Sequence, residues 1–219
     1  MAKTILTGRQ KQLLILLSGQ TVITKNFYLS GGTALAEYYL HHRYSEDLDF
    51  FSMDEVDPMA IQVILKKIQK NTKMQSVDFQ QSFNRNLFFL HSNGEVIKTE
   101  FTYYPFVQLE KPRIIDNLRI DSLLDIAVNK VFTIYQRPKS RDFIDLYLIM
   151  RQEKWPFLFL QEKARQKFDT HIDPLRMVSQ LLKIKELRDY PRMIIGIDLK
   201  KLEKFWLSQA ANLKTKVLK

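Results

Sequence analysis

The chain has 219 residues, no cysteine and a formal net charge of +10. The lack of cysteine excludes disulfide scaffolds, thiolate metal sites and cysteine nucleophiles, and 4 scattered histidines are too few to predict a zinc site. No run approaches the roughly 18 apolar residues of a membrane span, and the amino-terminal segment lacks the apolar core and cleavage site of a signal peptide. We therefore expect a soluble, cytoplasmic protein with one domain and an appended helical part.

The positive charge is concentrated in the last third of the chain. Residues 1–150 hold 18 basic and 16 acidic residues, whereas residues 151–219 hold 16 basic and 8 acidic residues. A basic surface attracts polyanions such as nucleic acids. The alternative interpretation is a solvated, lysine-rich helical surface with no such partner.

The first half of the sequence predicts alternating helices and strands. Thr7 and Asp57 are candidate N-caps, Pro58 suits a first helical position, and Asn93-Gly94 is typical of a hairpin turn. The expected helices are residues 8–18, 33–40 and 58–69, and the expected strands lie at 27–29, 48–51, 75–91 and 95–104.

After Pro112 the pattern becomes helical, with prolines between the segments. The expected helices are residues 121–136, 141–152, 157–168, 174–187 and 198–213. We therefore predict an α/β (α+β) core over residues 1–115, with a mixed β-sheet flanked by helices. A helical part over residues 116–219 is expected to pack on this core.

A glycine pair lies between the first expected strand and the following helix. Gly31 and Gly32, within Ser30-Gly31-Gly32-Thr33, would let the backbone approach a ligand closely, and the helix N-terminus would offer N–H groups to a phosphate. The alternative is an ordinary tight turn.

Two acids, Asp47 and Asp49, are spaced so that both project from the same face of a strand. Like charges this close favour a bridging divalent cation such as Mg²⁺, which prefers oxygen ligands. The alternatives are solvated acids on an exposed strand edge, or helix caps. Alternation in residues 96–101 puts Lys98 and Glu100 on one face, so Glu100 can supply a third carboxylate. Three carboxylates facing a phosphate-binding turn suit two-metal nucleotidyl transfer.

A third group of charged residues lies in the helical half. Lys130 is followed by Asp142 and Asp145, three residues apart at the start of an expected helix. Helix capping and surface exposure explain such residues without catalysis. A phosphate contact by Lys130 is the functional alternative.

Taken together, these segments resemble the AbiEii/MenT nucleotidyltransferase toxins of the DNA polymerase β-type superfamily. The resemblance covers about residues 25–150. It is carried by YLSGGTAL at 28–35, RYSEDLDFF at 43–51, Lys130, and RDFIDL at 141–146. The family resemblance implies a nucleotidyltransferase core.

The resemblance also implies roles for individual residues. The acids Asp47 and Asp49, with Glu100 as the weakest match, would bind Mg²⁺ or Mn²⁺. Lys130 would contact a phosphate, and the fourth motif falls on Asp142 or Asp145, with Asp142 favoured by its neighbour Arg141. The residues implied at the nucleotide are Gly31, Gly32, Thr33, Ser45, Lys130 and Asp145.

The implied reaction is metal-dependent transfer of NMP from an NTP to an acceptor hydroxyl, with release of pyrophosphate. The implied acceptor is RNA, and the tRNA 3′ end is the leading candidate. The implied setting is a toxin–antitoxin or abortive-infection system. Its implied partner is a cognate antitoxin protein, and no membrane partner is expected. Two alternatives stay open: a non-catalytic RNA- or antitoxin-binding module on a decayed transferase, and a transferase acting on protein or a small molecule.

Several aromatic residues can stack bases, although aromatics at such spacings are typical of a core. These residues are Tyr38, Tyr39, Tyr103, Tyr104, Phe205 and Trp206.

Overall fold

The computed structural model describes residues 4–72 and 74–217. The chain divides into two compact units, Met1–Ser122 (the first unit) and Leu123–Lys219 (the second unit). The sequence predicts a division at 115/116, whereas this one follows β7 (Leu118–Ile120), because β7 pairs with β1 (Tyr28–Ser30) inside the sheet of the first unit.

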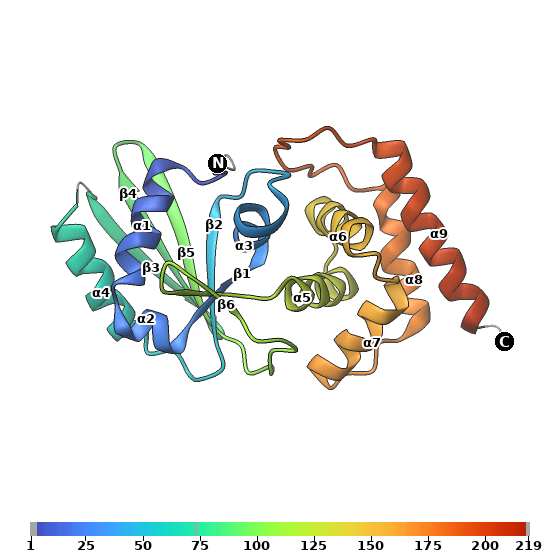
Figure 1. Cartoon of the computed structure of the whole chain (residues 1–219), viewed down its shortest axis with the longest axis horizontal. Helices are drawn as coiled ribbons and strands as arrows, with labels where there is room; N and C mark the ends of the chain where they lie inside the picture. The colour runs from blue at the N-terminus through green and yellow to red at the C-terminus, as the bar shows by residue number, and fades with distance from the viewer. Residues whose placement is uncertain (1–3, 73, 218–219) are drawn as a thin grey trace. The chain divides into compact units, whose positions relative to one another are not determined.

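The first unit is built on a mixed β-sheet, as predicted. Among the described residues the sheet has 7 strands in the order β3-β4-β5-β2-β1-β7-β6 (Figure 1). The remaining strands are β2 (Asp47–Ser52), β3 (Ser76–Ser82), β4 (Arg85–Ser92), β5 (Glu95–Tyr103) and β6 (Arg113–Ile115). The β2–β5 and β1–β7 pairs are parallel and the other pairs are antiparallel.

The helices of the first unit begin where the sequence places capping residues. Thr7 forms a capping box with Gln10 at the start of α1 (Gly8–Ser18), and Asp57 caps α4 (Pro58–Lys70), which confirms both predictions. A helix expected from Thr33 instead begins at Gly31, as α3 (Gly31–Leu35), and continues as a π-helical turn to Leu40. The short helix α2 (Thr21–Asn26) and the strands β6 and β7 are not predicted by the sequence.

Aromatic side chains form much of the core next to the central strands. Phe50 on β2 and Phe101 on β5 are paired across the sheet, and their rings stack with centroids 5.0 Å apart. Phe27 and Phe88 pack against Phe101 at 5.1 and 5.9 Å. This packing fixes one face of β2 in the core, so the acids at alternate positions lie on its other face.

The second unit is helical, which confirms that prediction. Its helices are α5 (Leu123–Gln136), α6 (Ser140–Glu153), α7 (Phe157–Phe168), α8 (Pro174–Leu182) and α9 (Leu199–Val217). In Figure 1, α5 lies beside α6, and α8 lies beside α9. Trp206 is fully buried between Phe143 and Phe157, and its indole N–H donates to the Phe143 carbonyl at 3.2 Å.

A buried ion pair joins two helices of this unit. Lys167 on α7 donates to Asp125 on α5 at 2.7 Å, and neither side chain is exposed to solvent. Replacing Lys167 by Met would remove the positive charge that faces a fully buried carboxylate, so we expect the free energy of unfolding to fall by about 3–5 kcal/mol. Urea titration measures this loss.

Arg165→Met is the matched control, because Arg165 lies on the same helix and its pair with Glu162 is exposed. Exposed pairs contribute little to stability, so this variant should stay close to the parent protein. Equal effects of the two substitutions would contradict the stabilising role of the buried pair.

Candidate active site

The strand register brings the candidate acids of the first unit into one row. Asp49 on β2 lies opposite Ser30 on β1 and Glu100 on β5. Asp47, two residues earlier on β2, lies opposite Lys98. The spacing of Asp47 and Asp49 therefore does place both carboxylates on one face of a strand, and the alternation of β5 places Lys98 and Glu100 beside them.

Gly31 lies directly against this row of acids, and Gly32 lies against residues just before β2. Gly31 has φ of +71°, and a Cβ at this position would overlap the carboxylate of Asp49. A Cβ at Gly32 would come within 2.9 Å of the Ser45 hydroxyl and would also overlap the guanidinium of Arg43. Glycine is thus required at position 31 for its left-handed backbone and its close approach to Asp49, whereas a side chain at position 32 would displace the ends of the Arg43 and Ser45 side chains.

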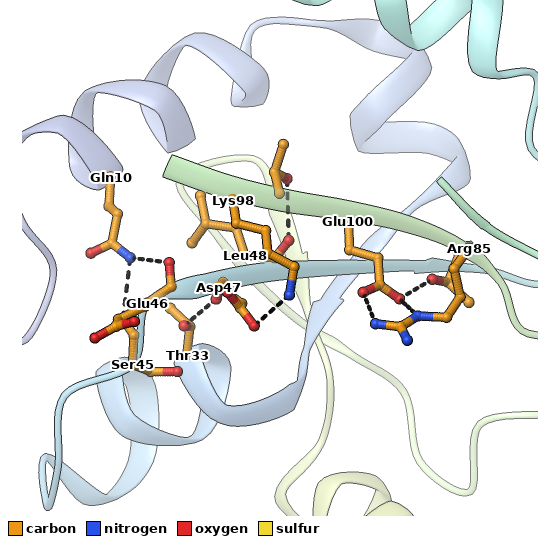
Figure 2. A network of polar contacts seen from close by, with 11 residues as sticks. Gln10, Thr33, Ser45, Glu46, Asp47, Leu48, Arg85, Lys98 and Glu100 are labelled. Atoms are coloured by element: carbon orange, nitrogen blue, oxygen red, sulfur yellow. Dashed lines mark hydrogen bonds and ion pairs between the residues drawn. The ribbon is translucent and has the colours of Figure 1, made fainter. Parts of the chain in front are cut away.

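Two further side chains hold the start of β2 in place. The Thr33 hydroxyl donates to the Asp47 carbonyl, and the Gln10 amide donates to the carbonyls of Ser45 and Glu46 at 3.1 and 2.9 Å (Figure 2). In this structure Thr33 therefore positions the acid-bearing strand. Its predicted contact with a nucleotide stays a prediction.

Two basic side chains accompany the acids. Lys98 donates to Asp47 at 2.8 Å, and Arg85 on β4 makes a two-pronged ion pair with Glu100 (Figure 2). Thr102 donates to the same Glu100 carboxylate at 2.6 Å. Besides its hydrogen bond to Glu100, the charges of Asp49 and Asp47 also act to raise the pKa of Arg85.

The surroundings of Glu100 alter its acidity. Burial acts to raise its pKa, but the hydrogen bonds from Arg85 and Thr102, together with the charges of Arg85 and Lys98, outweigh burial and hold the pKa below the ordinary 4.5. The hydrogen bond to Glu100 likewise raises the pKa of Arg85. Both groups are charged at neutral pH.

This shift predicts a pH dependence of stability in metal-free protein. Because the folded-state pKa of Glu100 is depressed, its ion pair stabilises the fold above pH about 4.5 and this stability is lost as the pH falls through the folded-state value. Between pH 7 and pH 3, the free energy of unfolding measured in urea should fall more for the parent protein than for Glu100→Gln. Identical losses would contradict the charge state assigned to Glu100.

Arg85 is a site residue that the sequence analysis missed, although a signal for it exists. The hairpin at Ser92–Glu95 fixes the register of β4 on β5, and counting back from this turn pairs Arg85 with Thr102, diagonal to Glu100. Diagonal neighbours on one face of a sheet are within reach of a long side chain.

The donor set of the first unit suits a cation held by two carboxylates. Asp47 and Asp49 supply hard oxygen ligands, and the Asp47 side chain is 31% exposed. Glu100 already accepts hydrogen bonds from Arg85 and Thr102. Within residues 4–72 and 74–217, no group of three or more histidines and acids is arranged to hold a metal ion.

The second unit brings together the other three predicted site residues. Lys130 on α5 donates to Asp142 at 2.6 Å and lies 2.8 Å from Asp145, and all three side chains are buried. Helix α6 has no side-chain cap hydrogen bond at its N-terminus, so capping does not account for Asp142. Both aspartates contact the lysine, and the choice between them as the fourth-motif residue stays open.

Comparison with known proteins decides the family. The family model of the nucleotidyl transferase AbiEii toxin of type IV toxin–antitoxin systems matches residues 15–207. The chain belongs to the AbiEii family. It is accordingly a nucleotidyltransferase, and the AbiEii match extends through the helical unit, well beyond the residues that carry the sequence motifs.

Individual proteins share sequence or fold with this chain. An uncharacterised protein of Aquifex aeolicus (strain VF5) is 33% identical over 169 residues, which cover 76% of this chain and 78% of that protein. Two crystal structures from Helicobacter pylori share the fold. A candidate nucleotidyltransferase has a TM-score of 0.63 and 18% identity, covering 96% of this chain and 97% of its own. The protein JHP933 has a TM-score of 0.61 and 19% identity, covering 96% and 94%.

Among the helices described, none combines the length and the apolar composition that a membrane span requires.

Proposed function

We propose that this AbiEii-family chain transfers an NMP group from an NTP to a hydroxyl of RNA and releases pyrophosphate. The observation that carries the proposal is the close approach of Gly31 to the carboxylate of Asp49 on β2. This contact brings the start of α3 close to one of the two strand β2 carboxylates, which suits a triphosphate accompanied by a cation.

Asp47 and Asp49 are the residues that would hold Mg²⁺ or Mn²⁺. Their oxygens match the ligand preference of these ions, which keep water and substrate phosphates in the rest of their shell. When bound, such an ion neutralises phosphate charge and lowers the pKa of the attacking hydroxyl. Glu100 was expected as a third ligand on the family resemblance, but its ion pair favours a different role, the fixing of Arg85 beside the two aspartates.

The chain's own cations would orient the triphosphate. Arg85 is held by Glu100 and Lys98 by Asp47, so both are fixed next to the acidic row before a substrate binds. Preorganised positive charge stabilises phosphate oxygens without a reorganisation cost during the reaction. In the second unit, Asp142 and Asp145 would orient the ammonium group of Lys130 for its predicted phosphate contact.

The charge of the second unit supports an RNA acceptor. Basic residues are exposed along the segment between α8 and α9 and on the first turns of α9. They are Lys185, Arg188, Arg192, Lys200, Lys201 and Lys204. Such a surface attracts the RNA backbone whatever its sequence, and the tRNA 3′ end is the acceptor that the family resemblance favours. Toxicity in a cell, and its control by a cognate antitoxin, belong to the same proposal and rest on the family.

The proposal is tested with four NTPs, each labelled on its α-phosphate. The protein is incubated with one labelled NTP at a time and with RNA and protein extracts. We expect label in the RNA fraction, at 3′ ends, with Mg²⁺ present and not with EDTA. Label only in protein would overturn the RNA acceptor and favour a protein-modifying transferase. RNA binding that is indifferent to Mg²⁺, with no transfer from any NTP, would favour a decayed, non-catalytic module.

A further inference from the structure

The second unit contains a cavity that lies apart from the Lys130–Asp142–Asp145 cluster. Its volume is about 370 Å³, which is within the range of small-ligand sites, and it lies where α6 ends, α7 begins and the second half of α9 passes. Six of its lining residues matter for its chemistry: Arg151, Lys154, Trp155, Phe205, Gln209 and Asn212.

The charge of this cavity is positive. Arg151 and Lys154 line it, and no aspartate or glutamate is among its lining residues in the described part of the chain. Glu153, which lies between them in the sequence, does not line the cavity, and its carboxylate accepts a hydrogen bond from Gln152 at 3.0 Å. The first turn of α7 borders the cavity without an acidic residue or a side-chain cap, so the helix N-terminus adds to the positive potential.

Aromatic rings form part of the wall. Phe205 is held between Tyr147 and Trp206, with ring centroids 5.0 and 5.1 Å away. Arg151 lies over the Tyr147 ring at 5.6 Å and donates to its hydroxyl at 3.1 Å. Trp155 follows Lys154, which ends α6 in a left-handed conformation, and it is only partly buried, with Phe159 as its ring neighbour at 6.2 Å. A flat ligand can therefore meet an already ordered aromatic surface.

Amide side chains complete the wall. Gln209 and Asn212 lie four and seven residues after Phe205 on α9, so they share its helix face. Each amide offers both a donor and an acceptor, which is what the edge of a nucleobase requires. A lipid or an apolar side chain would make no hydrogen bonds with these groups.

A second cavity, of about 390 Å³, adjoins the first through the shared residues Leu158 and Leu213. Here Arg165 is paired with Glu162 at 2.7 Å, so this neighbour is closer to electrically neutral. The pair of cavities provides an elongated surface with its positive end at Arg151 and Lys154.

We propose that the cavity at Trp155 and Phe205 binds one unpaired nucleotide of single-stranded RNA. The base would stack on the aromatic wall, Gln209 and Asn212 would hydrogen-bond its edge, and Arg151 and Lys154 would bind the adjoining phosphates. Aromatic stacking combined with cations on the backbone is how proteins bind single strands without strict sequence preference. The inference rests on the proposed function only in taking RNA as the acceptor, because binding here needs neither NTP nor metal.

Tryptophan fluorescence measures this binding directly. The chain has 2 tryptophans, and Trp206 is fully buried, so a bound base should quench the partly exposed Trp155. We expect a single-stranded RNA dodecamer, added in EDTA without NTP, to quench emission of the parent protein and not of Trp155→Phe. Affinity measured by anisotropy of labelled RNA should fall about tenfold in Trp155→Ala.

A charge-matched pair of variants separates local contacts from net charge. The double variant Arg151→Gln, Lys154→Gln should weaken RNA binding. The slope of log K against log salt concentration should become shallower by about 0.7 per lost cation. Lys66→Gln with Lys67→Gln removes the same charge from the exposed face of α4 in the first unit and should leave binding near that of the parent. Equal effects of the two pairs would overturn the site. Unchanged circular dichroism confirms that each variant is folded.

The outcomes distinguish this inference from the proposed function. Quenching at Trp155 without NMP transfer to RNA would support the nucleotide-binding cavity and would refute RNA as the acceptor of the transfer. Transfer with an unchanged KM for RNA in Trp155→Ala, together with absent quenching, would overturn the site and keep the transferase. Quenching by a cognate antitoxin peptide but not by RNA would also overturn the inference, in favour of a protein ligand.

Discussion

Asp47→Asn should lower the rate of NMP transfer by about a thousandfold or more while leaving the fold intact. The substitution keeps the size of the side chain but removes the charge that balances Lys98 and that would hold the cation. Asp47 is partly exposed, so little buried packing is lost. Steady-state transfer from labelled NTP to RNA measures the effect, and thermal unfolding checks the fold.

Asp54→Asn is the matched control for this variant. Asp54 belongs to the same acid-rich stretch but lies just beyond the end of β2, with its side chain exposed to solvent. We expect full transfer activity from it. A similar loss in both variants would show that general negative charge matters rather than the position of Asp47, and full activity of Asp47→Asn would refute the assigned site.

Gly31→Ala should abolish transfer and also destabilise the protein. A left-handed backbone costs an alanine about 1–2 kcal/mol, and the added methyl would overlap the Asp49 carboxylate. Asp49 or the bend must then move, which separates the helix start from the acid pair. Activity and urea unfolding, measured on the same preparation, record both effects.

Gly94→Ala is the control that separates backbone strain from the contact between residue 31 and Asp49. Gly94 has φ of +81°, so an alanine there carries a similar backbone strain, but nothing lies within 4 Å of an added Cβ. We expect a modest loss of stability and unchanged transfer. Should Gly94→Ala lose as much activity as Gly31→Ala, backbone strain alone would explain the result and the contact with Asp49 would have no role.

Much of the fold could be predicted because its signals are local. Thr7, Asp57 and Pro58 act on helix starts within a few residues, and the Asn93-Gly94 turn joins two adjacent strands. The period of two along a strand equally places Asp47 with Asp49 and Lys98 with Glu100. These expectations need no knowledge of which strands become neighbours.

What the sequence analysis missed depends on distant pairing. Strand β7 is short and follows Pro112, where the pattern turns helical, and it becomes a strand because Ile120 pairs with Leu29 far away in the chain. The role of Arg85 depends on the register of β4 on β5, and the burial of Lys130 depends on the packing of α5 against α6. Local propensity is a weak guide where such tertiary contacts decide.

Strand β2 has a hydrogen-bonded neighbour on each side, with β1 on one flank and β5 on the other. Backbone amides in the middle of a sheet open mainly when the whole unit opens, so we expect the backbone that carries the acid pair to exchange slowly. Catalytic competence and global folding should therefore disappear together as denaturant rises. We therefore expect few partly unfolded states that keep activity. Regulation is then expected to come from bound partners rather than from local unfolding of the strand that carries the acids.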